Sequence, residues 1–360
     1  MKAPRLLHIL LVALLVSAAS SCDVHEFPSG EAPEPGRGKA VLYLRFDNGD
    51  FDYLTTVDLS SRGAADPHDF RVTVRLYPLE PSRDGAQRVP SRDGLDYYSA
   101  TFEASGAHTA LSIPLELGAG EYRVAAWADY VADGTSDDLY YDTSDFIEVK
   151  LAGAFGEEGC GHPGNNPFRE AWRGLVDIVV DASGTVTMAG NRAGETTTVI
   201  PVDMERPLSR YHFVTTDLRK FLESEGTRDA SAGGSPSLDN YRVVVRYTGY
   251  MPSSYNVLAD RPVDSRTGVS YEGTLRALDA DRAEVAFDHV FVNHSETSAQ
   301  VSLELYRRAD GTRLSSTGQV DVPLRRGRYT LIEGPLLTTM AGASTGISPD
   351  FFGDFNIEIK

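Results

Sequence analysis

The chain has 360 residues, of which 41% are hydrophobic, and this length suffices for two or three domains. It carries 34 Lys and Arg against 52 Asp and Glu, a formal net charge of −18. This sign disfavours a nucleic-acid partner, because neutralising phosphates requires a basic face. Two cysteines are too few for a disulfide-stapled scaffold, and the many apolar residues exclude a chain that is disordered over most of its length.

Residues 1–21 have the features of a secretory signal peptide that ends at a lipidated cysteine. Lys2 and Arg5 precede an apolar stretch that is too short for the ~30 Å of hydrocarbon in a bilayer. Small residues then lead directly to Cys22, and this arrangement resembles the lipobox of bacterial lipoproteins, although Ala19 stands where leucine is most common. The resemblance implies cleavage before Cys22 and stable anchoring through acyl chains on that residue. An ordinary cleavage site beside an incidental cysteine is the simpler alternative.

The mature chain is expected to begin with a tether and to keep one other cysteine. Residues 22–38 are dominated by Pro, Gly and Glu and show no apolar periodicity, so we predict a flexible tether between the lipid and the fold. Cys160 then has no intramolecular partner. Cys160 and His162 offer two metal ligands, fewer than a zinc site needs, and a buried or incidental thiol is the favoured interpretation.

Beyond the tether, the pattern predicts antiparallel strands with one face in a core and the other in water. Residues 71–77 (RVTVRLY), 241–247 (YRVVVRY) and 301–306 (VSLELY) alternate from one side of the backbone to the other. Turn signals such as Asp310-Gly311 separate these stretches. Many short strands at near-regular spacing favour an all-β fold of tandem β-sandwich domains.

One helix and one domain boundary interrupt this pattern. Asp217 can cap a helix that begins at Leu218 and ends near Gly226, with apolar residues at helical spacing. Strand signals stop shortly before this helix, around the Arg206-Pro207 dipeptide. We therefore predict an N-terminal β-sandwich over residues 39–205 and a C-terminal β-sandwich, which contains the short helix, over residues 206–360.

The sequence shows no catalytic constellation. Residues 342–346 (GASTG) match the nucleophile-elbow pattern G-x-S-x-G, but no histidine lies downstream and the following residues would not start a helix. The histidines have no metal-binding spacing, and no phosphate loop or dinucleotide fingerprint is present. We therefore expect a protein that is not an enzyme and that holds no cofactor.

One loop gathers carboxylates and tyrosines that could bind a ligand. Its candidate residues are Asp129, Tyr130, Asp133, Asp137, Asp138, Tyr140 and Tyr141. Carboxylate oxygens suit Ca²⁺, but the spacing does not fit an EF-hand, and acidic clusters arise by chance in so acidic a chain. Tyrosine beside carboxylate is typical of sugar-binding surfaces, but tyrosine also commonly covers the ends of a β-sandwich. Calcium, a glycan and a purely structural role all stay open, and we assign no metal site.

Several stretches resemble a family of uncharacterised lipoproteins of Bacteroidetes. The match runs from about Cys22 to the end of the chain and is carried by residues 120–131 (GEYRVAAWADYV), 206–218 (RPLSRYHFVTTDL), 247–264 (YTGYMPSSYNVLADRPVD) and 346–359 (GISPDFFGDFNIEI). That family in turn is similar to the fimbrillin superfamily, the subunits and lipoprotein anchors of type V pili. The resemblance implies two transthyretin-like β-sandwich domains, an outer-membrane location at the cell surface, and no catalytic residues.

The fimbrillin resemblance also points to a candidate processing site. Fimbrillins polymerise by strand exchange after a protease removes an N-terminal strand at an arginine, and Arg62 is the nearest candidate here, with an ordinary polar turn as the alternative. An anchor subunit would keep both its lipid and its first strand. We therefore predict a fimbrillin-like anchor or accessory subunit that contacts pilus or other surface proteins through β-sheet edges. The alternative is a surface lipoprotein that binds glycans through its loop aromatics.

Overall fold

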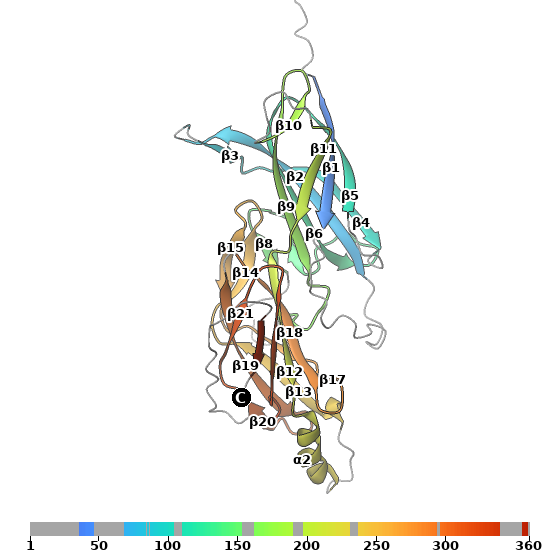
Figure 1. Ribbon diagram of the computed structural model, residues 1–360, viewed down its shortest axis with the longest axis vertical. Coiled ribbons are helices and arrows are strands. Elements are labelled where there is room, and N and C mark those ends of the chain that lie inside the picture. Colours follow the sequence, from blue (N-terminus) through green and yellow to red (C-terminus); the bar gives the residue numbers. More distant parts are fainter. Residues whose placement is uncertain are drawn as a thin grey trace, which may run out of the picture.

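The computed structural model describes most of the chain, namely residues 36–46, 68–83, 85, 87–103, 110–152, 162–189, 197–230, 237–293, 296–338 and 355–358. Cys22, Arg62 and Cys160 lie outside these residues, so the predictions for them stay predictions. The described part is almost entirely β-structure with one α-helix, which confirms the predicted all-β class of tandem antiparallel β-sandwiches. Figure 1 shows two β-units stacked along the long axis of the molecule.

The strands that precede residue 206 are β1 (Gly38–Phe46), β2 (His68–Pro81), β3 (Arg88–Pro90), β4 (Leu95–Glu103), β5 (Ala110–Leu117), β6 (Gly120–Ala132), β7 (Tyr141–Asp142), β8 (Val149–Leu151), β9 (Ala171–Val180), β10 (Val186–Met188) and β11 (Val199–Met204). All of them except β7 and β8 form the sheets of the first unit. The second unit contains β12 (Leu208–Thr215), α2 (Leu218–Ala230), the 3₁₀ helix η2 (Leu238–Asn240), β13 (Tyr241–Tyr247), β14 (Met251–Asn256), β15 (Arg261–Arg266), β16 (Ser270–Gly273), β17 (Arg276–Ala277), β18 (Ala283–Phe291), β19 (Thr297–Arg307), β20 (Arg313–Ser316), β21 (Val320–Leu324), β22 (Tyr329–Gly334) and β23 (Phe355–Glu358).

The first unit packs a small sheet on a larger one. The small sheet has the order β11-β1-β5, and the larger one has the order β10-β9-β6-β2, with β3 and β4 both pairing along the other side of β2. Alternation along β1 explains its place: Leu42 and Leu44 are fully buried, while Tyr43 and Arg45 face outward. The two leucines share a core with residues of the larger sheet such as Val72.

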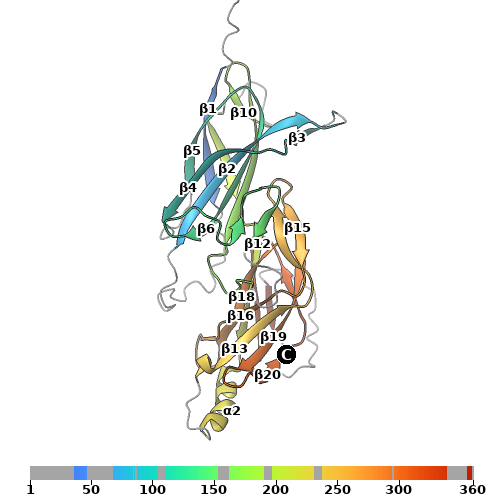
Figure 2. The ribbon, with the colours of Figure 1, turned by 180° about the vertical axis from the view of Figure 1, so that it is seen from behind.

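The second unit repeats this arrangement. One sheet has the order β17-β18-β12-β22-β23, and the other has the order β16-β13-β19, with β20 and β21 both pairing with β19. The first strand of each unit lies between an antiparallel and a parallel neighbour: β1 between β5 and β11, and β12 between β18 and β22. This shared arrangement was not evident from the sequence. Figure 2 shows the two units from behind.

Helix α2 begins where the sequence predicted but runs four residues further than Gly226. The buried side chains of Leu218 and Phe221 hold its first turns, and the Phe221 ring meets Tyr241 edge-on at 4.9 Å. A glycine inside a helix costs only about 1 kcal/mol, so Gly226 does not end it. Among the described residues, no helix is long and apolar enough to cross a membrane.

Strand pairing crosses the predicted boundary between the two units. A four-stranded sheet has the order β15-β14-β8-β7, so residues 141–151 pair with strands that follow residue 206. One core cluster also contains Trp127 and Tyr141 from the first half together with Phe291 from the second. The exact boundary stays a prediction, but the two units share both a sheet and a core.

A buried ionic cluster fastens the segment before β9 to the second unit. Asp288 on β18 accepts hydrogen bonds from the Arg169 guanidinium and, at 2.6 Å, from the Tyr247 hydroxyl. His162 Nε2 lies 2.7 Å from Oδ2 of the same Asp288 carboxylate. The side chains of Arg169, His162 and Asp288 are fully buried. Burial alone would raise the pKa of Asp288, but the neighbouring His162, Arg169 and Tyr247 outweigh it and lower that pKa.

We expect Asp288→Asn to destabilise the fold by about 3–5 kcal/mol, because it leaves the Arg169 charge buried without a counter-ion. Urea unfolding followed by tryptophan fluorescence measures this loss. Asp321→Asn, at an exposed position on β21, is the control and should change stability by no more than about 0.5 kcal/mol. Wild-type stability in Asp288→Asn would contradict the role given to the cluster.

Candidate functional site

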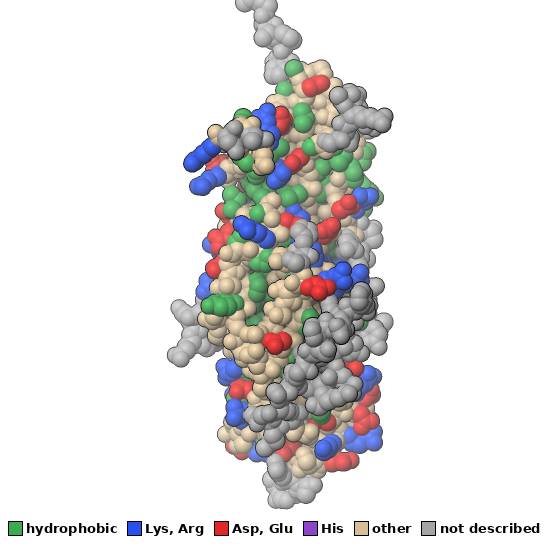
Figure 3. Space-filling view, turned by 60° about the vertical axis from the view of Figure 1, so that its left-hand side comes forward, with side chains coloured by type: hydrophobic (Ala, Val, Ile, Leu, Met, Phe, Trp, Pro, Cys, Tyr) green, Lys and Arg blue, Asp and Glu red, His purple; other side chains and the backbone are tan. Residues whose placement is uncertain are grey.

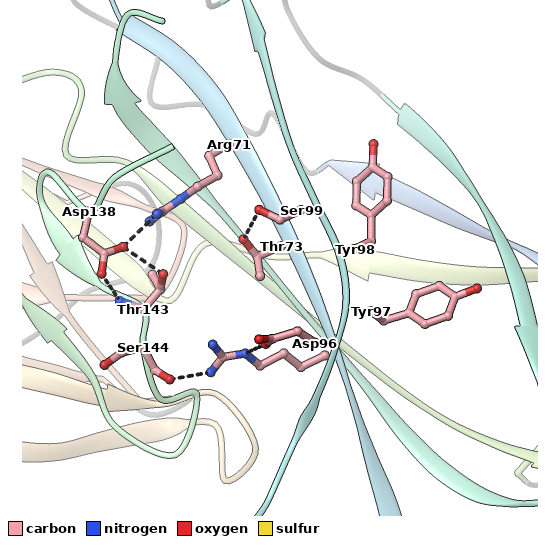
Figure 4. Close-up of a pocket in the computed structure, with 10 residues that line it drawn as sticks. Arg71, Thr73, Asp96, Tyr97, Tyr98, Ser99, Asp138, Thr143 and Ser144 are labelled. Carbon is pink, nitrogen blue, oxygen red and sulfur yellow. Dashed lines mark hydrogen bonds and ion pairs between the residues drawn. The ribbon is translucent and has the colours of Figure 1, made fainter. Parts of the chain in front are cut away.

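A polar groove lies beside the edge strand β4. It consists of two pockets of about 370 and 680 Å³ that share Asp138 and Ser144. The smaller pocket, drawn in Figure 4, is lined by Arg71, Thr73, Arg75, Asp96, Tyr97, Tyr98, Ser99, Asp138, Thr143 and Ser144. The larger pocket reaches the β14–β15 hairpin and is lined by Asp138, Asp142, Ser144, Glu148, Lys150, Leu151, Ala152, Ser253, Ser254, Asp264 and Arg266. We call both pockets together the polar groove.

One wall of the polar groove is a buried ion pair that the sequence did not predict. Arg71 on β2 faces Asp129 on β6, and its Nε and Nη2 donate to the two carboxylate oxygens at 2.9 and 2.7 Å. A third nitrogen of Arg71 donates to Asp138 at 2.7 Å. Burial raises the pKa of Asp129, and the Arg71 charge and hydrogen bonds oppose that rise. The guanidinium thus bridges two of the carboxylates proposed for calcium.

The other carboxylates of the predicted calcium loop do not converge with these two. Asp133 and Asp137 are exposed, whereas Asp129 is fully buried. Among the described residues, no group of three or more His, Cys, Asp or Glu side chains could hold a metal ion. Calcium binding at this loop stays a prediction, and the geometry favours an ion-pair role for Asp129 and Asp138.

The three predicted loop tyrosines pack into the protein. Tyr141 is fully buried, and its hydroxyl donates to the Arg169 carbonyl at 2.6 Å. Tyr130 meets the Phe168 and Trp172 rings edge-on at 5.4 and 6.1 Å, and burial raises its pKa to about 12. The Tyr140 hydroxyl accepts from Asn166 and lies 2.7 Å from His68 Nε2. These contacts all lie among residues 68–172, and they leave Tyr141 no face on which a sugar could stack.

Sequence reasoning did not single out β4, which is a sheet edge that no second described strand covers. It pairs with β2 from Leu95 to Glu103, and its other edge pairs with no described strand. Other edges are blunted: β11 contains Pro201, β15 contains Pro262 and two arginines, and β5 contains Pro114. Among the edge strands of the described sheets, β4 is the longest that has neither proline nor a basic residue. Natural edges of this kind are usually protected, because they can pair with another chain.

The aromatic residues of β4 pack against the core of the first unit. The Tyr97 hydroxyl donates to the Pro114 carbonyl and accepts from the Glu116 N–H, both at 2.9 Å, so Tyr97 ties β4 to β5. Figure 4 shows the rings of Tyr97 and Tyr98 pointing away from Arg71 and Asp138. Residues 95–103 (LDYYSATFE) include several aromatic residues and a threonine, which favour a β-strand. The sequence does not indicate that this strand lies at the edge of its sheet.

The surface around the second unit and the β2–β3 hairpin has mixed charge. In the view of Figure 3, acidic and basic side chains are interspersed, with apolar side chains between them.

Comparison with known proteins places the chain in a family. Residues 37–360 match the model of a family of unknown function (DUF6562). The chain belongs to this family. Its membership confirms the predicted resemblance to an uncharacterised family over nearly the whole chain. A search of curated proteins finds no match.

Several solved structures are distantly similar. The fimbrial anchor protein Mfa2 from Porphyromonas gingivalis is 15% identical, with 78% of this chain and 82% of that chain covered at a TM-score of 0.35. A candidate adhesin from Bacteroides ovatus is 12% identical, with 78% and 77% covered at a TM-score of 0.41. A candidate polysaccharide-binding protein from Bacteroides thetaiotaomicron is 12% identical, with 78% and 79% covered at a TM-score of 0.40.

We expect Arg71→Met to destabilise the fold by about 3–5 kcal/mol, because Asp129 would stay buried without its partner. Arg45→Met is the control: Arg45 pairs with Asp203 on the surface, and such pairs contribute about 0–1 kcal/mol.

Thermal unfolding should be unaffected by millimolar Ca²⁺ in the wild type. A calcium-dependent rise in its Tm would instead support calcium binding, one of the alternatives that the sequence leaves open for this loop.

Proposed function

We propose that this protein is a non-enzymatic surface lipoprotein, held in the outer membrane through Cys22, that acts as an anchor or accessory subunit by binding other surface proteins through a sheet edge. The outer edge of β4, with which no described strand pairs, carries this proposal. An extended segment of a partner could pair with β4 by main-chain hydrogen bonds, while the polar groove receives its side chains. The resemblance of the sequence to fimbrillin-like anchors supports the same class of partner.

The place of β1 supports an anchor that keeps its first strand. β1 is the middle strand of its sheet, and its Leu42 and Leu44 side chains are fully buried in the core. Losing β1 would therefore expose apolar core surface and two sheet edges at once. A subunit that stays attached to the membrane through its own N-terminus has a reason to retain this strand.

Lipid attachment is tested by labelling cells with an alkyne-bearing fatty acid. We expect the wild-type protein to carry the label and to fractionate with the outer membrane, and Cys22→Ser to lose both properties. Cys160→Ser is the matched control and should keep the label, because only Cys22 follows the lipobox-like run. A label retained in Cys22→Ser would contradict the anchor.

Edge binding is tested by placing a photo-crosslinking amino acid at Thr101, an exposed position on β4, in living cells. We expect a covalent adduct with a surface protein, and we expect Ser99→Lys in the same chain to reduce it, since a lysine protects an edge. The matched control carries the crosslinker at Asp310, in an exposed turn of the second unit. Equal adducts from both positions would refute specific pairing at β4.

A second candidate function, glycan binding, is favoured by the hydroxyl groups of the polar groove. Thr73, Ser99 and Ser144 line it, while the guanidinium of Arg75 is already bonded to Asp96 and to the Ser144 carbonyl. Hydroxyls beside fixed charges suit a polyhydroxylated ligand. Retention of the protein on a polysaccharide column, lost in Ser99→Lys and without any protein adduct at Thr101, would support this function over edge binding.

A further inference from the structure

β1 is loaded lengthwise if tension enters the fold from its N-terminal side. Its parallel pairing with β11 spans six residue pairs, from Val41 opposite Val199 to Phe46 opposite Met204. Its antiparallel pairing with β5 spans eight pairs. A pull along the strand axis therefore acts on both ladders of hydrogen bonds simultaneously.

The parallel neighbour of β1 leads directly into the second unit. β11 ends at Met204 and β12 begins at Leu208, and β12 is again paired on both sides, with β18 and with the parallel strand β22. In Figure 1, β11 and β12 follow one another along the long axis, and α2 lies at the end away from the start of β1. β1, β11 and β12 thus form a continuous line through the molecule, joined by one sheet ladder and one short peptide connection.

This geometry loads the β1–β11 ladder in shear. Tension that enters at the start of β1 and leaves through the second unit pulls β1 one way and the end of β11 the other way. Two parallel strands pulled from opposite ends cannot open one hydrogen bond at a time, as a hairpin pulled from its open end can, so the bonds must yield together. Forced unfolding is governed by the unfolding rate, which such simultaneous loading keeps low.

The connection between β11 and β12 is braced by ion pairs. Arg206 bonds to Glu170 at 3.1 Å and lies over the Trp172 ring at 5.0 Å from its centroid. Arg173 on β9 reaches Asp260 of the second unit at 3.0 Å, and Arg326 bonds to the same carboxylate. Partly buried pairs that share partners in this way hold the connection in one geometry.

We infer that the shear-loaded β1–β11 ladder is a mechanical clamp, and that transmitting tension through the first strand is a further function of this protein. The inference rests on the proposed membrane anchor only for the source of the tension. The buried side chains of Leu42 and Leu44 lock β1 against sliding, because a slip of one residue would turn them to solvent.

The clamp is tested by single-molecule pulling on the complete mature chain, released from the membrane by Cys22→Ser, with handles at Arg37, whose side chain is exposed, and Asp310. Two matched variants are compared, Leu42→Ala on β1 and Leu76→Ala on β2, whose leucines are 0% and 2% exposed in the same core cluster. Both variants lower the equilibrium stability. We expect the first rupture force to fall in Leu42→Ala and to stay at the wild-type value in Leu76→Ala.

A second pair of handles, at Arg83 and Asp310, loads β2 in place of β1. With these handles the first rupture force should fall in Leu76→Ala and stay at the wild-type value in Leu42→Ala. Equal losses of rupture force in both variants, in both geometries, would overturn the inference, because force would then report only overall stability. Both outcomes are independent of the lipid. If Cys22 proves unlabelled while the order of rupture forces holds, the anchor fails and the clamp stands.

Discussion

The structure depends on the buried contact between Arg169 and Asp288. A carboxylate and a guanidinium lose several kcal/mol of hydration each when buried, so they need close partners to offset that loss. His162 and Tyr247 add two further contacts to the Asp288 carboxylate. Since Arg169 directly precedes β9 and Asp288 lies within β18, this cluster fixes the larger sheet of the first unit relative to the second. The shared sheet through β8 and β14 and the braced connection before β12 can form only in that placement.

Local patterns predicted the class of the fold but not its connections. The alternation in residues 71–77 corresponds to the two faces of the strand. Val72 and Val74 are fully buried in the core, while Thr73 and Arg75 face the polar groove. The start of α2 also followed from apolar residues at helical spacing. By contrast, β8 is three residues long, and its pairing with β14 has no local signal. The parallel pairing of β1 with β11 joins residues too far apart in sequence for periodicity to reveal it.

Of the predicted loop residues, only Asp138 lines the polar groove, because burial changes what a residue type means. Asp129 belongs to an acidic cluster in the sequence, but in the fold its nearest charge is Arg71, 58 residues away. Tyr141 was likewise a candidate for ligand binding in the sequence, but in the fold its hydroxyl donates a hydrogen bond to the Arg169 carbonyl. The residues of β4 predict a strand, because β-propensity is a local property. Its position at the edge of a sheet depends on the order of the strands, which the local sequence does not determine.

The open edge of β4 and the clamp at β1 lie in opposite sheets of one unit, and this separation has a mechanical consequence. A partner strand held at β4 would pull on β2 and, through the side chains of the core, on β1. A partner held by the second unit would instead pull through β11 and β12. In the first case the load crosses packed apolar side chains, which resist sliding weakly in comparison with a sheared ladder of hydrogen bonds. The place where a partner attaches therefore decides which part of the fold bears the load, while β1 carries it in either case.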